Sequence, residues 1–370
     1  MIEIDGSQKS GSGTILRDSI PFSVLTGDGL HMTNIRAKRS KPGLRPQHLK
    51  AAEACAEICG GRLEGASVGS TDIVFQPGDR IRGGAYTFNI GTAGSATMLA
   101  MAVLPLALFA EGPSVYRITG GLFQDFAPPA FYFQKVLLPV LRRMGIQAEF
   151  TILRPGYVPR GGGQIELHID PLQGKLRPIM LTEQGRITAV KGIALSSLLK
   201  DRRVSERMAA SCNKILASEG LHADIDVLYD EEKSPVYGEP SPQPGAALMV
   251  WAETDTGCVI ASDTAGARGR TSEAVGKKTA AKLIQDIQTG ATVDRYLADQ
   301  LIPYAAFAEG KSEYRIPSVT DHVAARLWLI EEFFQTKTRL TEKRLEIEVL
   351  GIGAAEEKIP DGRDVPGTGR

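Results

Sequence analysis

Cysteine is scarce in this sequence, and the few that occur lack the spacing of a metal-binding or disulfide framework. The 370 residues contain four, Cys55, Cys59, Cys212 and Cys258, and no two of them form a CxxC pair. Zinc sites and disulfide-stapled domains need closely spaced or numerous cysteines. We therefore expect buried, reduced thiols, as in proteins of a reducing compartment.

Long apolar segments are also missing. The most apolar run, residues 96–110, contains Pro105 and is too short to cross a bilayer. The first residues lack the basic and apolar regions of a secretory signal. These absences predict a cytoplasmic protein with no membrane partner.

The chain has no excess of charge of either sign. Lys and Arg together number 43, as do Asp and Glu, so no overall field attracts a polyanion. An anion site must therefore come from local clustering. Residues 36–50 hold six basic side chains and no acid, with a Pro-Gly turn that fixes the loop. This cluster is either a phosphate-binding loop or a solvated charged loop.

A pattern of strand, helix, strand, helix, strand, strand occurs twice, in residues 2–78 and 85–169, and a partial third copy covers residues 293–353. The roughly 100 residues before the third copy have strands and helices of their own. The sequence therefore predicts an α/β (α+β) fold of repeated βαβαββ units, with a core at 1–183 and 291–352. It also predicts an inserted α/β domain at 184–290 and, from its lack of apolar residues, a disordered tail at 353–370.

His322 stands at the start of an apolar helix pattern in residues 318–334. Ser318 and Asp321 have the spacing of a capping box, which places the imidazole in the first helical turn. There the helix dipole favours the neutral imidazole, the form that attacks electrophiles. A capping or interface histidine without chemistry is the alternative that the spacing leaves open.

Two further stretches carry weaker signals. In "YLADQL", residues 296–301, Tyr296, Asp299 and Gln300 share one helix face. That face either hydrogen-bonds a base or ribose, or is a solvent-facing stripe. The glycine-rich turn at residues 5–14 leads from a strand into a helix, but it lacks the spacing of a P-loop.

Taken together, these motifs resemble RNA 3'-terminal phosphate cyclases. The similarity runs in the family's order through nearly the whole chain. Its pieces are "DGSxxxGxGxILR" at 5–17, "IRAKRSKPGLRPQHL" at 35–49, "LEGASVGSTDIVFQPG" at 63–78, "IGTAGSAT" at 90–97, "GGLFQDFAPPAF" at 120–131, "GYVPRGGGQIE" at 156–166, "YLADQL" and the helix of His322.

The resemblance implies three βαβαββ units, a fold shared with enolpyruvyl transferases, and a smaller inserted domain. It also implies a reaction in which His322 attacks the α-phosphate of ATP, releases pyrophosphate and carries AMP. The AMP then passes to an RNA 3'-phosphate, and the adjacent 2'-OH closes a 2',3'-cyclic phosphodiester and releases AMP.

The resemblance further assigns roles to residues at matching positions. The expected ATP-binding residues are Tyr296, Leu297, Ala298, Asp299, Gln300 and Pro128. The expected phosphate- and RNA-binding residues are Arg17, Arg36, Arg39 and Gln47.

Two positions depart from the family pattern. Ser10 stands where the family usually has a glutamate that helps to hold a divalent ion, and Met101 stands where it usually has a glutamine near the nucleotide. A protein-held metal site is thus weakened, although Mg²⁺ or Mn²⁺ can arrive on the ATP phosphates. These departures leave open a catalytically weak or inactive relative that binds RNA or protein, which His322 argues against. The shared fold also raises the alternative of an enolpyruvyl transferase. Those enzymes have six units and a longer chain, so the count of about three units argues against this alternative.

Overall fold

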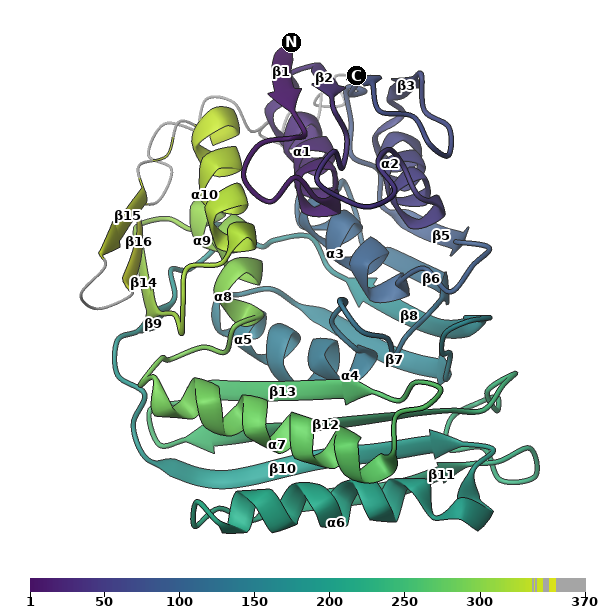
Figure 1. Cartoon of the computed structure of the whole chain (residues 1–370). Helices are drawn as coiled ribbons and strands as arrows, with labels where there is room; N and C mark the ends of the chain where they lie inside the picture. The colour runs from purple at the N-terminus through teal and green to yellow at the C-terminus, as the bar shows by residue number, and fades with distance from the viewer. Residues whose placement is uncertain (335, 337, 342–345, 351–370) are drawn as a thin grey trace, which may run out of the picture.

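The computed structural model describes residues 1–334, 336, 338–341 and 346–350, and these form four sheets of four strands each (Figure 1). Three sheets share one strand order, and each contains one parallel and two antiparallel pairs. The predicted α/β class with three βαβαββ units is confirmed. The predicted tail at 353–370 lies outside the described residues.

The first unit runs through β1 (Ile2–Asp5), α1 (Gly13–Thr26), β2 (Leu30–Thr33), α2 (Pro46–Cys59), β3 (Arg62–Glu64) and β4 (Ile73–Gln76). Local signals set the helix ends. The hydroxyl of Ser12 accepts a hydrogen bond from the backbone N–H of Thr14 at the start of α1. Gly27 ends α1 at φ 72°, a conformation in which glycine has no steric cost.

The second unit consists of β5 (Gly84–Asn89), α3 (Ala96–Ala107), β6 (Ser114–Gly120), a helical segment, β7 (Ala148–Arg154) and β8 (Gly163–Ile169). The helical segment divides into α4 (Ala130–Tyr132), the π-helix η1 (Phe133–Leu137) and α5 (Leu138–Arg143), where the sequence predicts one α-helix. Pro139 has no N–H for a normal helical hydrogen bond, and its ring crowds the preceding turn, so the backbone widens before it.

The third unit begins earlier in the chain than the sequence pattern indicates. β9 (Met180–Leu181) pairs in parallel with β14 (Lys311–Arg315), although more than a hundred residues separate them. The unit continues with α8 (Leu297–Gln300), α9 (Ile302–Phe307), α10 (Asp321–Phe334), β15 (Thr338–Thr341) and β16 (Glu346–Leu350). The copy is therefore complete, because β9 is the strand that the sequence pattern lacks.

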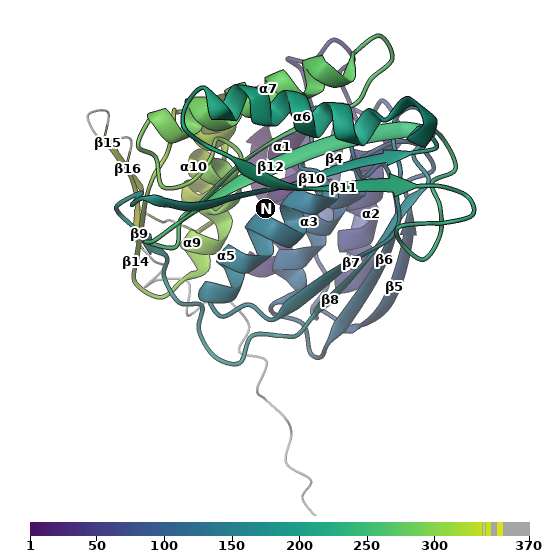
Figure 2. The same ribbon diagram turned by 90° about the horizontal axis from the view of Figure 1, so that it is seen from below.

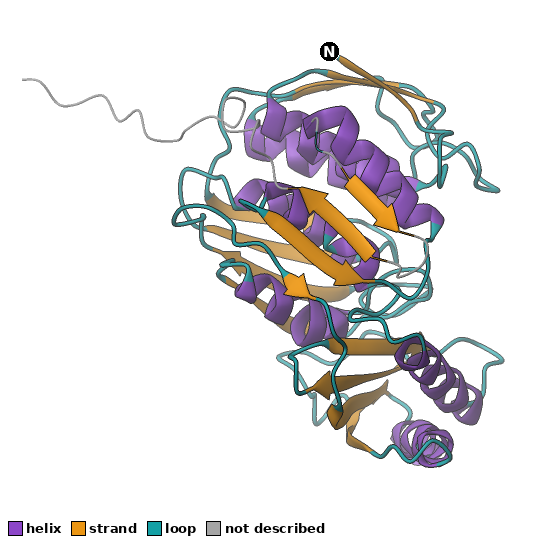
Figure 3. Ribbon diagram, turned by 90° about the vertical axis from the view of Figure 1, so that its left-hand side faces the viewer, coloured by secondary structure: helices purple, strands orange, loops and turns teal. Residues whose placement is uncertain are grey.

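The chain between β9 and α8 forms the fourth sheet and two helices. These are β10 (Ile187–Ser197), the short 3₁₀ helix η2 (Lys200–Arg202), α6 (Val204–Ala217), β11 (Ala223–Asp230), β12 (Gly245–Thr254), β13 (Val259–Ala265) and α7 (Ser272–Gln288). We call this part the inserted segment. α6 and α7 cover one face of its sheet and enclose a separate apolar core (Figures 1 and 3). The exact boundaries at 183/184 and 290/291 stay a prediction.

The helices of the three units meet in the centre of the molecule. α1 contacts α2, α3 and α10, and Figure 2 shows central helices between the sheet of β6–β8 and strands β9 and β14. The four cysteines are buried and free, as the sequence predicts. No helix among the described residues is long and apolar enough to cross a membrane. This central packing brings distant helix ends together.

Candidate active site

A cavity of about 460 Å³ opens where helix ends of all three units meet the inserted segment. Its volume is within the range of small-molecule sites, about 300–1,000 Å³. α1, α2 and α10 contribute N-terminal residues, and β13 and α7 contribute the opposite wall. The residues that line the cavity include Thr14, Arg17, Arg36, Arg39, Gln47, His48, Asp125, Phe126, Pro128, Asp263, Lys282, Tyr296, Asp299, Gln300, His322 and Arg326.

His322 lies in the first turn of α10 and is half-buried. Thr320 caps this helix through its hydroxyl, which accepts from the N–H of Val323 at 3.2 Å, so the predicted Ser318 cap is wrong although the first-turn placement is correct. Burial lowers the pKa of the imidazole, Asp299 opposes this, and the positive charges of the nearby arginines, including Arg39, lower the pKa further. The ring is therefore neutral near pH 7.

Thr14 sets the orientation of that ring from α1. Its Oγ1 atom lies 2.9 Å from Nδ1 of His322, and it also accepts a hydrogen bond from Arg17 at 3.3 Å. If Nδ1 of the neutral ring carries the proton and donates to Thr14, Nε2 keeps a free lone pair. The contact thus suits a nucleophilic Nε2.

Gly13 and His48 fit closely beside this turn. A Cβ atom on Gly13 would stand 2.1 Å from Nε2 of His48, so any larger residue at the start of α1 would force the imidazole of His48 to move. Burial and the surrounding arginines lower the pKa of His48 to about 3, and its Nδ1 accepts from the backbone N–H of Arg45 at 3.3 Å. His48 is therefore neutral near pH 7. It lines the cavity, and its Nε2 atom lies beside Gly13 of α1.

Arg326 lies one helical turn after His322 and is 2% exposed. It forms ion pairs with Asp18 at 2.7 Å and with Asp299 at 3.0 Å, which join α10 to α1 and α8. Burial raises the pKa of Asp299, and Arg326 opposes that rise. These two ion pairs fix the position of α10, and so of His322, relative to α1 and α8.

The basic loop has divided roles. Arg36 donates from Nη1 to the carbonyls of Lys41 and Gly43, both at 2.7 Å, so its guanidinium braces the loop. Arg39 is exposed at the cavity and close enough to affect His322 electrostatically. Oε1 of Gln47 accepts from the N–H of Ser95 at 2.9 Å, which leaves its amide NH₂ for a ligand.

Only part of "YLADQ" faces the cavity. Tyr296, Asp299 and Gln300 line it, whereas Leu297 and Ala298 are fully buried and do not. Gln300 is 4% exposed, and its Oε1 atom has no hydrogen-bond partner within the described part of the chain. A buried acceptor of this kind is costly unless a ligand satisfies it.

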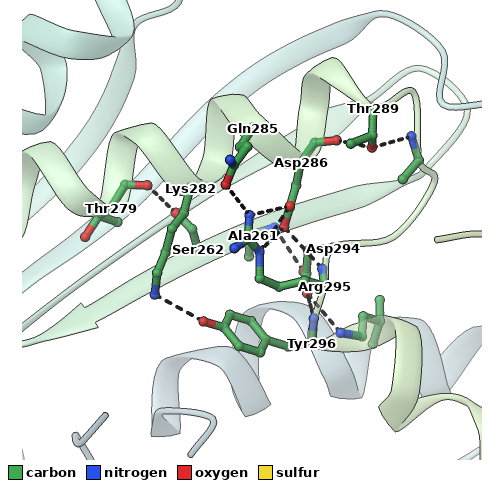
Figure 4. Close-up of polar contacts among 12 residues, drawn as sticks. Ala261, Ser262, Thr279, Lys282, Gln285, Asp286, Thr289, Asp294, Arg295 and Tyr296 are labelled. Carbon is green, nitrogen blue, oxygen red and sulfur yellow. Dashed lines mark hydrogen bonds and ion pairs between the residues drawn. The ribbon is translucent and has the colours of Figure 1, made fainter. Parts of the chain in front are cut away.

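The inserted segment holds the turn between α7 and α8 in place (Figure 4). Asp294 accepts from the backbone N–H groups of Ala261, Tyr296 and Leu297 at 2.8–3.0 Å. Lys282 donates to the hydroxyl of Tyr296 at 3.1 Å and to the carbonyl of Asp263 at 2.9 Å. Tyr296 is thereby anchored to α7 and β13.

Other predicted positions differ in how they meet the cavity. Pro128 and Met101 line it, and the carbonyl of Pro128 accepts from the hydroxyl of Thr97 at 2.6 Å. Ser10 is buried against Ser12, with 3.0 Å between the hydroxyl oxygens, and is not part of the lining. Throughout the described ranges, no group of three or more His, Cys, Asp or Glu side chains converges as a metal site.

Several lining residues are not predicted from the sequence. Arg326 had a visible signal, since it lies four positions after His322 and so on the same helix face. Thr14 lies within the glycine-rich motif but resembles any helix-start threonine. Asp263 and Lys282 had no signal, because nothing in the pattern relates the inserted segment to the cavity.

The comparisons with known proteins agree with one another. The family model described as RNA 3'-terminal phosphate cyclase matches residues 8–340. A protein of that name from Methanopyrus kandleri is 38% identical over 363 residues, which covers 98% of this chain and 99% of the relative. One from Hyperthermus butylicus is 41% identical over 315 residues, which covers 84% of this chain and 86% of the relative.

Among solved structures, the enolpyruvyl transferase NikO from Streptomyces tendae aligns with 94% of this chain and 81% of its own. The TM-score is 0.26 at 12% identity. A similarity this low does not define the fold, which follows instead from the strand order of the sheets.

Proposed function

The chain belongs to the RNA 3'-terminal phosphate cyclase family, and from this premise we propose that it converts an RNA 3'-phosphate end into a 2',3'-cyclic phosphodiester with ATP as second substrate. One observation carries the proposal. A neutral His322 and the N-terminus of α1 face the same cavity as Arg17 and Arg39. This arrangement places a nucleophile beside groups that bind phosphate.

In the first step, Nε2 of His322 attacks the α-phosphorus of ATP. The N–P bond forms as the bond from that phosphorus to the bridging oxygen breaks, and pyrophosphate leaves with the electron pair. Nδ1 keeps its proton and donates a hydrogen bond to Oγ1 of Thr14, 2.9 Å away, which stabilises the positive charge that develops on the ring. The product is histidyl-AMP.

In the second step, an oxygen of the RNA 3'-phosphate attacks the phosphorus of histidyl-AMP, and the N–P electron pair returns to His322. The 3'-phosphate then carries AMP, a good leaving group. The adjacent 2'-OH attacks the activated 3'-phosphorus, loses its proton to water and displaces AMP. The cyclic end forms because the phosphate is first converted into an electrophile.

The ATP base and ribose are assigned to the wall formed by Tyr296, Gln300 and Pro128. The unpaired Oε1 of Gln300 suits an amino or hydroxyl donor of the nucleotide. Leu297 and Ala298 support this wall from behind rather than contact ATP with their side chains, because both are fully buried.

The phosphates are assigned to the N-terminus of α1, Arg17, Arg39 and the amide of Gln47. Arg17 is 8% exposed, and its Nε atom has no hydrogen-bond partner in the described part of the chain. A buried guanidinium with an unused donor is suited to an anionic ligand. Arg36 contributes by holding the loop that carries Arg39.

Among the residues that the structure describes, no cluster of side chains forms a metal site. Ser10, at the position of the family's glutamate, has only a hydroxyl, and this contacts Ser12. A divalent Mg²⁺ or Mn²⁺ ion that accompanies ATP would be held by phosphate and water oxygens. The steps above depend on no protein ligand to it.

A 3'-phosphorylated oligoribonucleotide tests this function. With ATP, the end should become resistant to phosphatase, and AMP and pyrophosphate should appear in equal amounts. An oligonucleotide with a 2'-O-methyl group on its last ribose should accept AMP but remain uncyclised. An end that stays sensitive to phosphatase, without nucleotide release, would contradict the proposal.

A further inference from the structure

Phe126 is an apolar side chain left in the open beside the catalytic cavity. It is 99% exposed and is one of the residues that line the cavity, in the loop between β6 and α4. Its φ of 66° is in the left-handed region, which is unfavourable for a bulky residue. Both the exposed ring and the positive φ cost free energy in the unbound protein, and a ligand that covers the ring would offset that cost.

The loop around Phe126 is held from both sides. Its neighbour Asp125 forms two hydrogen bonds with Arg270 of the inserted segment, at 3.1 and 2.8 Å. On the other side, Thr97 of α3 holds the carbonyl of Pro128. The chain is therefore held on both sides of Phe126, at Asp125 and at Pro128.

The surroundings favour a single-stranded nucleic acid over ATP as the partner of this ring. Proteins bind single strands by combining aromatic platforms for the bases with basic side chains for the backbone, and the exposed Arg39 lines the same cavity. Tyr296, the aromatic residue of the proposed ATP wall, is only partly exposed and is fixed by Lys282. Adenine is thus assigned to the anchored Tyr296, and the fully exposed ring of Phe126 is left for a base of the polynucleotide.

We propose that Phe126 is a stacking platform for the 3'-terminal nucleobase of the RNA and so positions the terminal phosphate toward His322. This inference rests on the proposed function, because it assigns the polynucleotide subsite of that reaction. Stacking requires only a π-face, so the subsite should accept all four bases with modest differences.

Binding of a 5'-fluorescent, 3'-phosphorylated oligoribonucleotide, followed by anisotropy, tests the subsite directly. Phe126→Ala keeps the Cβ and therefore the same backbone strain, and it should weaken binding roughly tenfold or more. Phe126→Trp should retain binding, and Phe126→Leu, which has bulk without a π-face, should not. The matched control is Val158→Ala, since Val158 is 58% exposed and lies outside the cavity lining.

A second oligonucleotide, abasic at its last residue, identifies the contact. If the ring stacks on that base, Phe126→Ala should have no effect on binding of the abasic strand. An equal loss with both strands, or no loss with either, would overturn the proposal.

Labelling of the protein by ATP separates this idea from the proposed function. Phe126→Ala should leave the rate of histidyl-AMP formation and its KM for ATP unchanged. A raised KM for ATP would assign the ring to adenine and refute the RNA subsite. Failure of the wild-type protein to form histidyl-AMP would overturn the reaction, whereas the anisotropy results would still decide the role of Phe126.

Discussion

Nδ1 of His322 and Oγ1 of Thr14 lie 2.9 Å apart, although 308 positions separate the two residues in the sequence. The contact exists because α10 of the third unit packs against α1 of the first. It joins the proposed nucleophile to the helix whose N-terminus faces the same cavity. The repeated fold thereby supplies both a neutral imidazole and a hydroxyl within hydrogen-bond distance of its Nδ1 atom.

Thr14→Val should slow histidyl-AMP formation. Valine has nearly the same shape but cannot accept a hydrogen bond from Nδ1 of His322. Because one hydrogen bond contributes about 0.5–1.5 kcal/mol, the rate should fall roughly two- to tenfold. Thr14→Ser keeps the hydroxyl and should stay close to wild type. Single-turnover labelling with saturating ATP measures both, and equal rates in the two variants would contradict the assigned role of Thr14.

Arg39→Ala should change the pH dependence of labelling. The wild-type rate should fall only below pH 6.5, because burial and nearby arginines lower the pKa of His322 from that value. Removing the Arg39 charge makes the protonated ring less unfavourable, so the pKa rises and the acidic limb of the profile moves to higher pH.

The plateau rate of Arg39→Ala should also fall, since a phosphate contact is lost. Lys41→Ala is the control, because Lys41 is an exposed cation of the same loop that does not line the cavity. A profile and plateau like those of the wild type, with unchanged stability, would exclude Arg39 from the site.

Arg326→Leu should destabilise the fold rather than only the reaction. The change leaves Asp18 and Asp299 without the cation that lies 2.7 and 3.0 Å from them, and breaking a buried ion pair from one side costs about 3–5 kcal/mol. The free energy of unfolding in urea measures this. Adding Asp18→Leu to Arg326→Leu should recover part of the loss.

The exposed Arg268 provides the comparison for that experiment. Arg268→Leu should change the free energy of unfolding by no more than about 0.5 kcal/mol. A loss for Arg326→Leu as small as this would show that the buried cluster does not hold α10 to α1 and α8.

Lys282→Met should raise the KM for ATP several-fold with a smaller effect on the rate at saturation. Methionine keeps the apolar stem but loses the hydrogen bonds to Tyr296 and to the carbonyl of Asp263. Lys278→Met, on the same helix and outside the cavity lining, should resemble the wild type. An unchanged KM for ATP in Lys282→Met would show that Lys282 of the inserted segment does not contribute to ATP binding.

The repeated units were predictable because each keeps the same order of short strands and amphipathic helices. The first strand of the third unit was not, since β9 has only two residues and its partner β14 follows the whole inserted segment. Similarly, the apolar pattern of residues 293–310 predicts one helix, but the structure has α8 and α9 there. Pro303, the second residue of α9, has no N–H with which to continue the hydrogen bonds of α8.

The candidate site was predictable where a motif lies in one segment, as at Tyr296, Gln300 and His322, which all line the cavity. Contacts between segments were not. The hydrogen bond from Lys282 to Tyr296 and the ion pair of Arg326 with Asp18 depend on how helices pack. Periodicity shows that a helix face is polar or apolar, but not which distant side chain it meets.

Transfer of label from the α-phosphate of ATP to the protein tests the central claim most directly. Incubated with such ATP and a divalent metal, the wild-type protein should acquire an acid-labile, alkali-stable label, as expected of a phosphoramidate on histidine. His322→Ala should acquire none while keeping its fold, and His48→Ala should still be labelled. No label on the wild type, or equal label on His322→Ala, would contradict His322 as the carrier of AMP.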